Sequence, residues 1–392
     1  MRRTRTSRTT TTAATAALLL ATAACSSVYS GGPAPTDGLP DTVQVVSLNP
    51  TTGVVAFVGD SANKGYQLAV DQINAEDFLE GTRIELDLVD TKSEPQTAAR
   101  EMTKVTVGGD VSAVFGSVSS NEALAMSPLA ERSELPVIYT QAGSDGVLNS
   151  DYTWRATPLM REYYPALSRY IGETGARSIG ILYSEANPTV QDIGTNTLPA
   201  MAEELGIEVT GSVGTQATTQ DFSAPINQVL AGDPDLVAVL LVGAANPTAM
   251  TQLRQAGYDG PVLGNAGASG GSLDPAGEDG VGMVWASNFH HQMEAASSQA
   301  FVAAYREEYG EDPLAYAAEA YDAAWFLARA LKEAGSADRI SVKDGMLAVA
   351  DQPVDGALGE QISWTDRQIV TPGVVVEYSP DGEALVYEAS AG

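Results

Sequence analysis

One short stretch, SAVFGSVSSNE at Ser112–Glu122, carries residue types suited to binding a small anionic group. It predicts an apolar strand, a turn of small residues at 116–120 and the start of a helix. Ser119 and Glu122 have the spacing of a capping box. Backbone N–H groups at such a helix start, together with the helix dipole, favour an anion such as a carboxylate. The alternative is that these serines only cap the helix.

The tripeptide Asn-Pro-Thr follows three predicted strands and begins at Asn49, Asn187 and Asn246. At the last two places the pattern is typical of an Asn N-cap followed by proline in the first helical turn. Each Asn amide can accept from the helix and donate to a ligand, so these residues are candidate contacts, with capping alone as the alternative. Small polar residues at 141–145 and 265–269 also follow strands. A cleft rimmed by such groups suits a small polar molecule.

The sequence offers few residues for catalysis. Its two histidines, His290 and His291, are adjacent, and neighbouring side chains on a strand point to opposite faces, so a metal site is not expected. There is no G-x-x-x-x-G-K-[ST] loop, no G-x-G-x-x-G after the first strand, no G-x-S-x-G elbow and no H-E-x-x-H pair. We therefore expect no enzyme, no cofactor and no metal. A secreted α/β hydrolase that uses Ser117 is a remote alternative.

The charge of the chain excludes two classes of partner. The 392 residues contain 50 acidic and 21 basic side chains, and four of the basic ones fall in Met1–Arg8. The remaining 17 cannot supply the cationic surface that nucleic acid or an anionic membrane face requires. The acidic side chains are expected on a solvated surface that keeps the protein soluble and monomeric.

The N-terminus has the pattern of a bacterial lipoprotein leader. Basic Met1–Arg8 is followed by the apolar run Ala13–Ala24, which is too short to span a bilayer and suits a signal-peptide core. Cys25, the sole cysteine, comes next and is the expected site of lipidation, with residues 1–24 removed. A plain cleaved signal peptide is the alternative. The Gly/Pro/Ser-rich segment 25–40 is expected to be a flexible tether.

Strands and helices alternate through the rest of the chain, which predicts an α/β fold with parallel sheets and right-handed crossovers. Two successive runs of this alternation predict two Rossmann-like lobes of similar build. Strands are expected at 43–48, 83–89, 113–115, 136–140, 179–183, 207–213, 236–242, 262–264 and 283–286, and within 362–388. Helices are expected at 60–78, from 93, at 158–175, 189–205, 222–230, 247–256, 295–309, 313–334 and 342–350.

In its ordered set of short motifs, the chain resembles the solute-binding proteins of branched-chain amino-acid ABC transporters, which have the type I periplasmic-binding fold. The resemblance covers about 43–378. It rests on Thr52-Gly53 followed by Gly65, Ala69 and Ile73-Asn74, on Ile84–Asp90, on Val114–Ser117 with Ser119-Ser120, on Leu135–Ile138 before Ala142, on Asp221-Phe222 and on Leu253–Gly257.

The resemblance implies two lobes joined by a hinge of three crossover segments, with a ligand between them. Lobe 1 is expected at 41–157 and 289–355, and lobe 2 at 158–288 and 356–392. In the first lobe Ser119 would cap the helix through Glu122, and the ligand carboxylate would be held by the turn 116–120 and by 142–144. The second lobe would contribute from 185–189, 244–248 and 265–267. The candidate contacts are Ser117, Val118, Ser119, Ser120, Ala142, Gly143, Ser144, Glu185, Asn187, Asn246 and Asn265.

The expected function is that of an extracytoplasmic protein, held at the membrane by a lipid on Cys25, which captures a small polar solute and delivers it to an ABC permease. An amino acid is the leading ligand. Amides, urea-like molecules and small carboxylates follow, and a sensory role in place of transport is a further alternative. The sequence does not separate these.

The second lobe departs from the family's amino-acid binders. Those proteins place an acid near position 266 to pair with the ligand ammonium, and here Asn265-Ala266-Gly267 contains none. Aromatic side chains are also missing after the second-lobe strands. An unpaired buried ammonium is strongly unfavourable. Either Glu185 or Asp145 takes that role, or the ligand has no ammonium.

Overall fold

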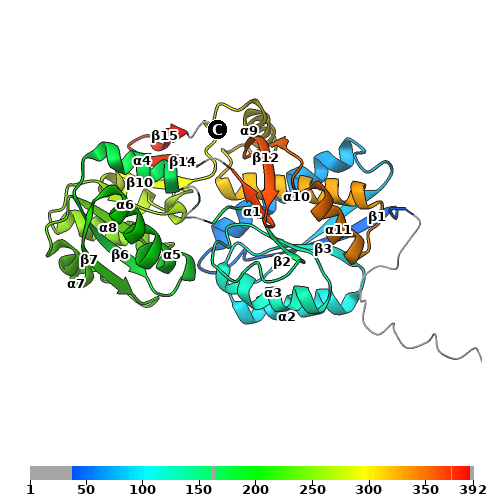
Figure 1. Ribbon diagram of the computed structural model, residues 1–392, viewed down its shortest axis with the longest axis horizontal. Coiled ribbons are helices and arrows are strands. Elements are labelled where there is room, and N and C mark those ends of the chain that lie inside the picture. The colour runs from blue at the N-terminus through cyan, green and yellow to red at the C-terminus, as the bar shows by residue number, and fades with distance from the viewer. Residues whose placement is uncertain (1–37, 160–161, 163, 372, 389–392) are drawn as a thin grey trace, which may run out of the picture. The chain divides into compact units, whose positions relative to one another are not determined.

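The computed structural model describes residues 38–159, 162, 164–371 and 373–388. The expected leader, Cys25 and most of the expected tether lie outside these residues. The described chain forms two separate sheets, one of eight strands and one of seven (Figure 1). Most neighbouring strands in both sheets run parallel, as the alternation of strand and helix predicts.

The first sheet has the strand order β11-β12-β13-β5-β4-β3-β1-β2. Its centre is apolar because strands covered by helices on both faces are buried. Phe115 of β3, for example, stacks on Tyr66 of the neighbouring helix with ring centroids 4.2 Å apart. The bounds are β1 (Thr42–Asn49), β2 (Arg83–Asp90), β3 (Val111–Gly116), β4 (Val137–Tyr139), β5 (Thr153–Arg155), β11 (Val354–Gly356), β12 (Gly359–Thr365) and β13 (Gln368–Val370).

Helices from two distant parts of the chain pack on this sheet. The most extensive packing between two elements joins α1 (Ala56–Ala75) to α10 (Ala315–Ala334). In Figure 1 these helices lie together over the sheet. Gly65 of α1 permits the close approach, since a Cβ there would lie 2.1 Å from the carbonyl oxygen of Ala317. The other helices are α2 (Pro95–Gly108), α3 (Ser120–Arg132), α9 (Ala296–Tyr309) and α11 (Arg339–Val349).

The second sheet has the order β15-β14-β10-β9-β8-β6-β7. Its parallel part comprises β6 (Ser178–Ser184), β7 (Glu208–Thr215), β8 (Leu236–Leu240), β9 (Val262–Leu263) and β10 (Met283–Ser287). The C-terminal β14 (Val374–Ser379) and β15 (Gly382–Glu388) extend it as an antiparallel hairpin. Antiparallel pairing also joins β11, β12 and β13. The sheets are thus mainly parallel as predicted, and the strand-like tail pairs antiparallel, because a hairpin needs no crossover helix.

The helices of the second sheet begin close to their predicted positions. They are α4 (Tyr164–Thr174), α5 (Pro188–Asp192), α6 (Leu198–Leu205), α7 (Ser223–Leu230) and α8 (Ala245–Gln255). The helix predicted at 189–205 is continuous but changes to π-helical geometry at Ile193–Thr197. Within the described residues no helix is both long enough and apolar enough to cross a membrane.

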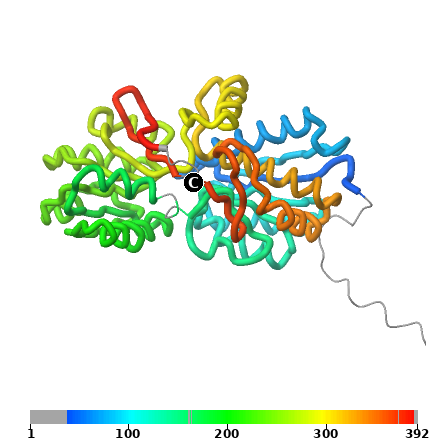
Figure 2. The backbone as a smooth tube through the Cα atoms, turned by 45° about the horizontal axis from the view of Figure 1, so that its top comes forward, coloured from blue at the N-terminus to red at the C-terminus, as the bar shows by residue number. Residues whose placement is uncertain are grey.

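The chain passes between the two sheets three times. The passages follow β5, β10 and β13. In Figure 2 the orange part of the chain lies among the blue and cyan elements, whereas the red hairpin lies beside the green and yellow ones. The segment 356–392, expected as a whole in the second lobe, is divided between the sheets: β12 and β13 pair within the first sheet, and β14 and β15 pair within the second.

Candidate functional site

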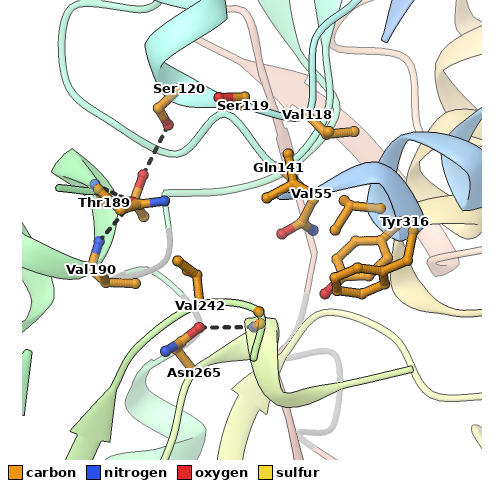
Figure 3. Close-up of a pocket in the computed structure, with 15 residues that line it drawn as sticks. Val55, Val118, Ser119, Ser120, Gln141, Thr189, Val190, Val242, Asn265 and Tyr316 are labelled. Atoms are coloured by element: carbon orange, nitrogen blue, oxygen red, sulfur yellow. Dashed lines mark hydrogen bonds between the residues drawn. The ribbon is translucent and has the colours of Figure 1, made fainter. Parts of the chain in front are cut away.

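A pocket is lined by segments that follow strands of both sheets (Figure 3). It encloses about 590 Å³ of empty space, part of which is open to solvent. Parallel strands present their carboxyl ends at one edge of a sheet, which is where open α/β sheets bind ligands. The lining consists of Val55, Phe57, Val58, Val118, Ser119, Ser120, Gln141 and Tyr316 from the chain around the first sheet, and of Asn187, Thr189, Val190, Val242, Gly243, Asn265 and Gly267 from the chain around the second.

The turn after β3 is fixed by Asn49, which ends β1. The amide oxygen of Asn49 accepts from the backbone N–H of Val118 at 3.0 Å, and its nitrogen donates to Ser47 Oγ at 3.0 Å. Asn49 is fully buried. The first Asn-Pro-Thr tripeptide therefore positions the pocket wall through its Asn, a role that the sequence did not indicate.

The predicted capping box at Ser119 and Glu122 does not form. Ser119 is the N-cap of α3 by its backbone angles, but its side chain makes no capping hydrogen bond. The buried Glu122 carboxylate instead accepts from Ser117 Oγ and, at 2.9 Å, from Thr91 Oγ1. Burial raises the pKa of Glu122, and these two hydroxyl groups partly oppose that rise. Ser117 is thus engaged behind the turn and is not part of the pocket lining, whereas Ser119 is.

The loop between β1 and α1, which ends at Val55, leads into the first turn of α1 with Phe57 and Val58, and Asp90 at the end of β2 holds this loop. The Asp90 carboxylate accepts from the backbone N–H groups of Thr51 at 2.9 Å and Thr52 at 3.2 Å, and from Thr52 Oγ1 at 2.6 Å. Partial burial raises the pKa of Asp90, but these bonds and one from the Lys92 N–H outweigh it and lower the pKa to about 2.

Ser93, which follows β2, also holds this loop and does not start α2 as predicted. Its hydroxyl donates to the carbonyl of Thr52 at 3.1 Å, and it accepts from the backbone N–H of Val55 at 3.3 Å. The N-cap position of α2 is held by Glu94. Two polar residues that follow β2 therefore shape the apolar wall of the pocket.

Three hydroxyl groups join the two sides of the pocket. Thr189 Oγ1 lies 2.9 Å from Ser120 Oγ and 2.9 Å from Ser144 Oγ, and the backbone N–H of Ser144 donates to Ser120 Oγ at 3.3 Å. Figure 3 shows the bond between Ser120 and Thr189. All three side chains are more than nine-tenths buried. The structure therefore brings Ser120 and Ser144 together as predicted, but with Thr189 as their partner.

Gln141 connects the pocket to a buried carboxylate. Its backbone lies in the left-handed region, with φ of 51°, and Glu319 of α10 accepts from its N–H at 3.2 Å and from its Nε2 at 2.5 Å. Glu319 also accepts from Asn288 Nδ2 at 2.7 Å and from the hydroxyl of Thr157. Full burial raises the pKa of Glu319 to about 8 although these donors oppose the rise. Thr157 and Asn288 belong to two of the three passages between the sheets.

Asn187 and Asn265 line the pocket from the second sheet, as predicted. Asn187 caps α5, because its Oδ1 accepts from the N–H groups of Thr189 at 3.0 Å and Val190 at 3.2 Å. Both ends of the Asn265 amide are used within the second sheet, by the N–H of Gly267 and the carbonyl of Leu241. The Nδ2 group of Asn187 thus remains able to donate to a ligand, whereas the Asn265 amide is used to hold the backbone of the pocket wall.

Besides Ser117, five predicted contacts lie outside the lining, namely Ser144, whose bonds are given above, and Asn246, Glu185, Ala142 and Gly143. Asn246 is not an N-cap: α8 already begins at Ala245, and the buried Asn246 amide donates to the carbonyl of Gly267 at 3.1 Å. Glu185 is exposed and accepts from Gln216 Nε2. Ala142 and Gly143 are buried beneath the pocket, and the Ala142 carbonyl accepts from Arg155 Nη1 at 3.1 Å.

The most important residues missed from the sequence are Phe57 and Tyr316. Phe57 packs edge-on against Tyr316, with centroids 5.9 Å apart, and the Tyr316 hydroxyl donates to the carbonyl of Ala266 at 2.6 Å. Tyr316 lies in a helix far along the chain and carries no local signal for the site. The expected start of the first helix at 60 left Phe57 in a loop, although α1 begins at Ala56.

Metal-ligating side chains do not cluster in the part of the chain that the structure describes: no three of His, Cys, Asp and Glu meet there. His290 is buried and His291 half-buried, with rings 4.2 Å apart after β10. Burial, and then the neighbouring His291, lower the pKa of His290 to about 4. Neither ring lines the pocket.

Two mainly parallel α/β sheets joined by three passages, with a pocket lined from both, define the fold class of type I periplasmic binding proteins. The family model described as "Periplasmic binding protein" matches residues 42–383, and the chain belongs to that family. The family consists of extracytoplasmic binding proteins and not of enzymes.

Relatives and solved structures agree with this assignment. A protein of Brucella abortus named Leu/Ile/Val-binding protein homolog 7 is 25% identical over 339 residues, which cover 81% of this chain and 84% of that protein. A leucine-binding protein of Thermotoga maritima has a TM-score of 0.80 at 24% identity, covering 88% of this chain and 98% of that one. A branched-chain amino-acid binding protein of Streptococcus pneumoniae, solved with isoleucine, has a TM-score of 0.78 at 26% identity, covering 89% and 100%.

Proposed function

We propose that the protein captures a small organic solute in the pocket between its two sheets and delivers it to an ABC permease. The observation that carries this proposal is the pocket itself, lined by seven residues from the chain around one sheet and eight from the other. Such a lining lets one ligand contact both halves of the protein. Branched-chain amino-acid binding by a relative in Streptococcus pneumoniae supports a transport role.

We also propose that each sheet with its helices forms one lobe, that the three passages serve as the hinge, and that the protein acts as a monomer.

The leader pattern supports lipid anchoring through Cys25. The wild-type protein should be labelled at Cys25 when cells are grown with radioactive palmitate. The variant Cys25→Ala should not be labelled and should be released from the membrane fraction of producing cells. Retention of Cys25→Ala at the membrane would contradict the anchor and leave solute capture untouched.

The test of solute capture is mass spectrometry of the purified chain under native conditions, combined with thermal shift against a metabolite panel. A solute that binds only the folded state must raise its melting temperature. We expect one bound small molecule per chain, and Phe57→Ala, which removes a ring from the lining, should reduce occupancy. The absence of any bound or stabilising solute would contradict the proposal.

A further inference from the structure

The pocket contains no ionisable acid or base of the kinds that pair with charged solutes. None of its fifteen lining residues is Asp, Glu, Lys, Arg or His. The two acids that an amino-acid ligand would need, Glu185 and Asp145, are exposed and lie outside the lining. The buried Glu319 lies behind Gln141 and accepts from it, and Glu122 accepts from Thr91 and Ser117.

This lining does not suit an ammonium group. A buried ammonium requires a carboxylate nearby, since desolvation without a partner is strongly unfavourable. The side-chain acceptors in the lining without a partner among the described residues are neutral: the Oε1 of Gln141, whose Nε2 is held by Glu319, and the hydroxyl oxygen of Ser119. Neutral oxygens lack the negative charge that an ammonium requires.

The unused hydrogen-bond donors, by contrast, lie on both sides of the pocket. The Ser119 hydroxyl makes no capping bond, and within the described chain it has no other partner. Asn187 uses its oxygen to cap α5, so its Nδ2 is the atom left to donate to a ligand. Helix α3 begins beside Ser119, and its first N–H groups add positive potential. A group that only accepts hydrogen bonds can use all of these.

The rest of the lining is apolar. The hydroxyl of Tyr316 is engaged with Ala266, so its ring is what faces the pocket (Figure 3). Phe57 also lines the pocket and packs edge-on against this ring. Such walls stabilise a hydrocarbon or aromatic body by removing it from water. The apolar residues of the lining besides these two rings are Val55, Val58, Val118, Val190 and Val242.

We infer that the pocket selects a small, largely apolar carboxylic acid that has no amino group. The carboxylate is bound by Ser119, Asn187 and the start of α3, and the body lies against the valines and the two rings. This inference rests on the proposed function and names the class of solute for the same pocket.

Matched pairs of probes test the inference on the purified protein. L-leucine is compared with 4-methylpentanoate, and L-phenylalanine with 3-phenylpropanoate, by calorimetry and thermal shift. In each pair the two probes share a carboxylate and a hydrocarbon body and differ in the amino group. We expect the acid without the amino group to bind about tenfold or more tightly than its partner. Equal or tighter binding of either amino acid would overturn the inference and leave solute capture intact.

Mass spectrometry of the ligand retained during purification provides an independent outcome. A retained carboxylic acid without an amino group supports the inference, and a retained compound with an ammonium group overturns it. If neither the probes nor the retained fraction yields a bound solute, the proposed function fails, and the inference fails with it.

Asn187→Asp provides a variant of nearly identical shape. Asp caps helices as well as Asn, so α5 is retained, but the donor in the pocket becomes an anion. We expect the affinity for 4-methylpentanoate to fall by about tenfold or more and the preference against L-leucine to shrink. Asn149→Asp, on an exposed loop, adds the same charge away from the lining and should leave both affinities unchanged. If Asn187→Asp retains its melting temperature and its affinity for the acid, Asn187 does not bind the carboxylate and the inference is wrong.

Discussion

Thr189 Oγ1 lies 2.9 Å from Ser120 Oγ, although the two residues belong to chain segments around different sheets. The same Thr189 oxygen lies 2.9 Å from Ser144 Oγ, so one hydroxyl bridges two first-sheet segments. Ser120 and Ser144 are two of the residues that the resemblance assigns to the ligand carboxylate. Because the hydroxyls of both serines are hydrogen-bonded to Thr189, the hydroxyl left unengaged on the first-sheet side of the pocket is that of Ser119.

Thr189→Val should weaken this connection. Valine keeps the shape of threonine but leaves two buried serine hydroxyls without their partner, which costs about 1–2 kcal/mol. We expect the free energy of unfolding, measured with urea, to fall by this amount. Thr189→Ser keeps the hydroxyl and should remain closer to the wild type. Equal losses in the two variants would show that the methyl group, and not the hydroxyl, supports this contact.

Glu319 should make the stability of the protein depend on pH. Its folded-state pKa, raised by burial to about 8, lies above the value of about 4.5 in an unfolded chain. The folded state therefore binds the proton more tightly, and the contribution of Glu319 to stability is complete below pH 4.5 and is lost as pH rises to 8. The largest slope for one group is about 1.4 kcal/mol per pH unit.

The effect of Glu319 is isolated by subtracting the unfolding free energy of Glu319→Gln, which has no carboxyl group to titrate at this position, from that of the wild type. The difference in unfolding free energy should fall between pH 5 and pH 8, as measured with urea. Glu333→Gln, an exposed change on the same helix, should give a constant difference over that interval. A constant or rising difference for Glu319→Gln would contradict the raised pKa.

The elements of the fold could be predicted from the sequence, whereas the partners of most site residues could not. Alternating apolar strands and amphipathic helices report local burial, so the first strand, predicted at 43–48, is observed at Thr42–Asn49. The alternation of strands and helices along the chain predicts parallel sheets, and parallel sheets bind ligands at the carboxyl ends of their strands, where the pocket lies. β5 was missed because its three residues, Thr153–Arg155, lack the apolar run that marks the equally short β4.

Side-chain partners depend on residues far apart in the chain. Glu122 has the spacing of a local capping box, but Thr91 and Ser117 compete for its carboxylate in a buried setting where an unpaired charge is unfavourable. Asn246 has the pattern of a cap, but Gly267 takes its amide. Asn187, which has the same local pattern, does cap its helix. Only tertiary contacts distinguish these last two residues.

Gly65 should tolerate no side chain, because α1 and α10 meet at this position. A Cβ would lie 2.1 Å from the Ala317 carbonyl oxygen, so Gly65→Ala must push the helices apart. Forcing extra atoms into a packed core costs about 1–3 kcal/mol. We expect an unfolding free energy lower by that amount.

Gly172→Ala in α4, where no other atom lies within 4 Å, should instead stabilise the helix by about 0.5–1 kcal/mol. Similar effects of the two changes would contradict tight packing at Gly65.

Asp90 should affect both stability and solute binding, because it holds the loop that leads to Val55 and to Phe57 at the start of α1. Asp90→Asn removes the charge that strengthens its hydrogen bonds from Thr52, and we expect a loss of about 1 kcal/mol at pH 7, with weaker solute binding. The folded-state pKa of about 2 lies below the unfolded value, so this stabilisation is present above pH 4 and is lost as pH falls toward 2. The gap between wild type and variant in urea unfolding should therefore narrow from pH 5 to pH 3. Asp87→Asn, an exposed change on the same strand, should show neither effect. Normal solute affinity in Asp90→Asn would show that the loop keeps its place without the carboxylate charge.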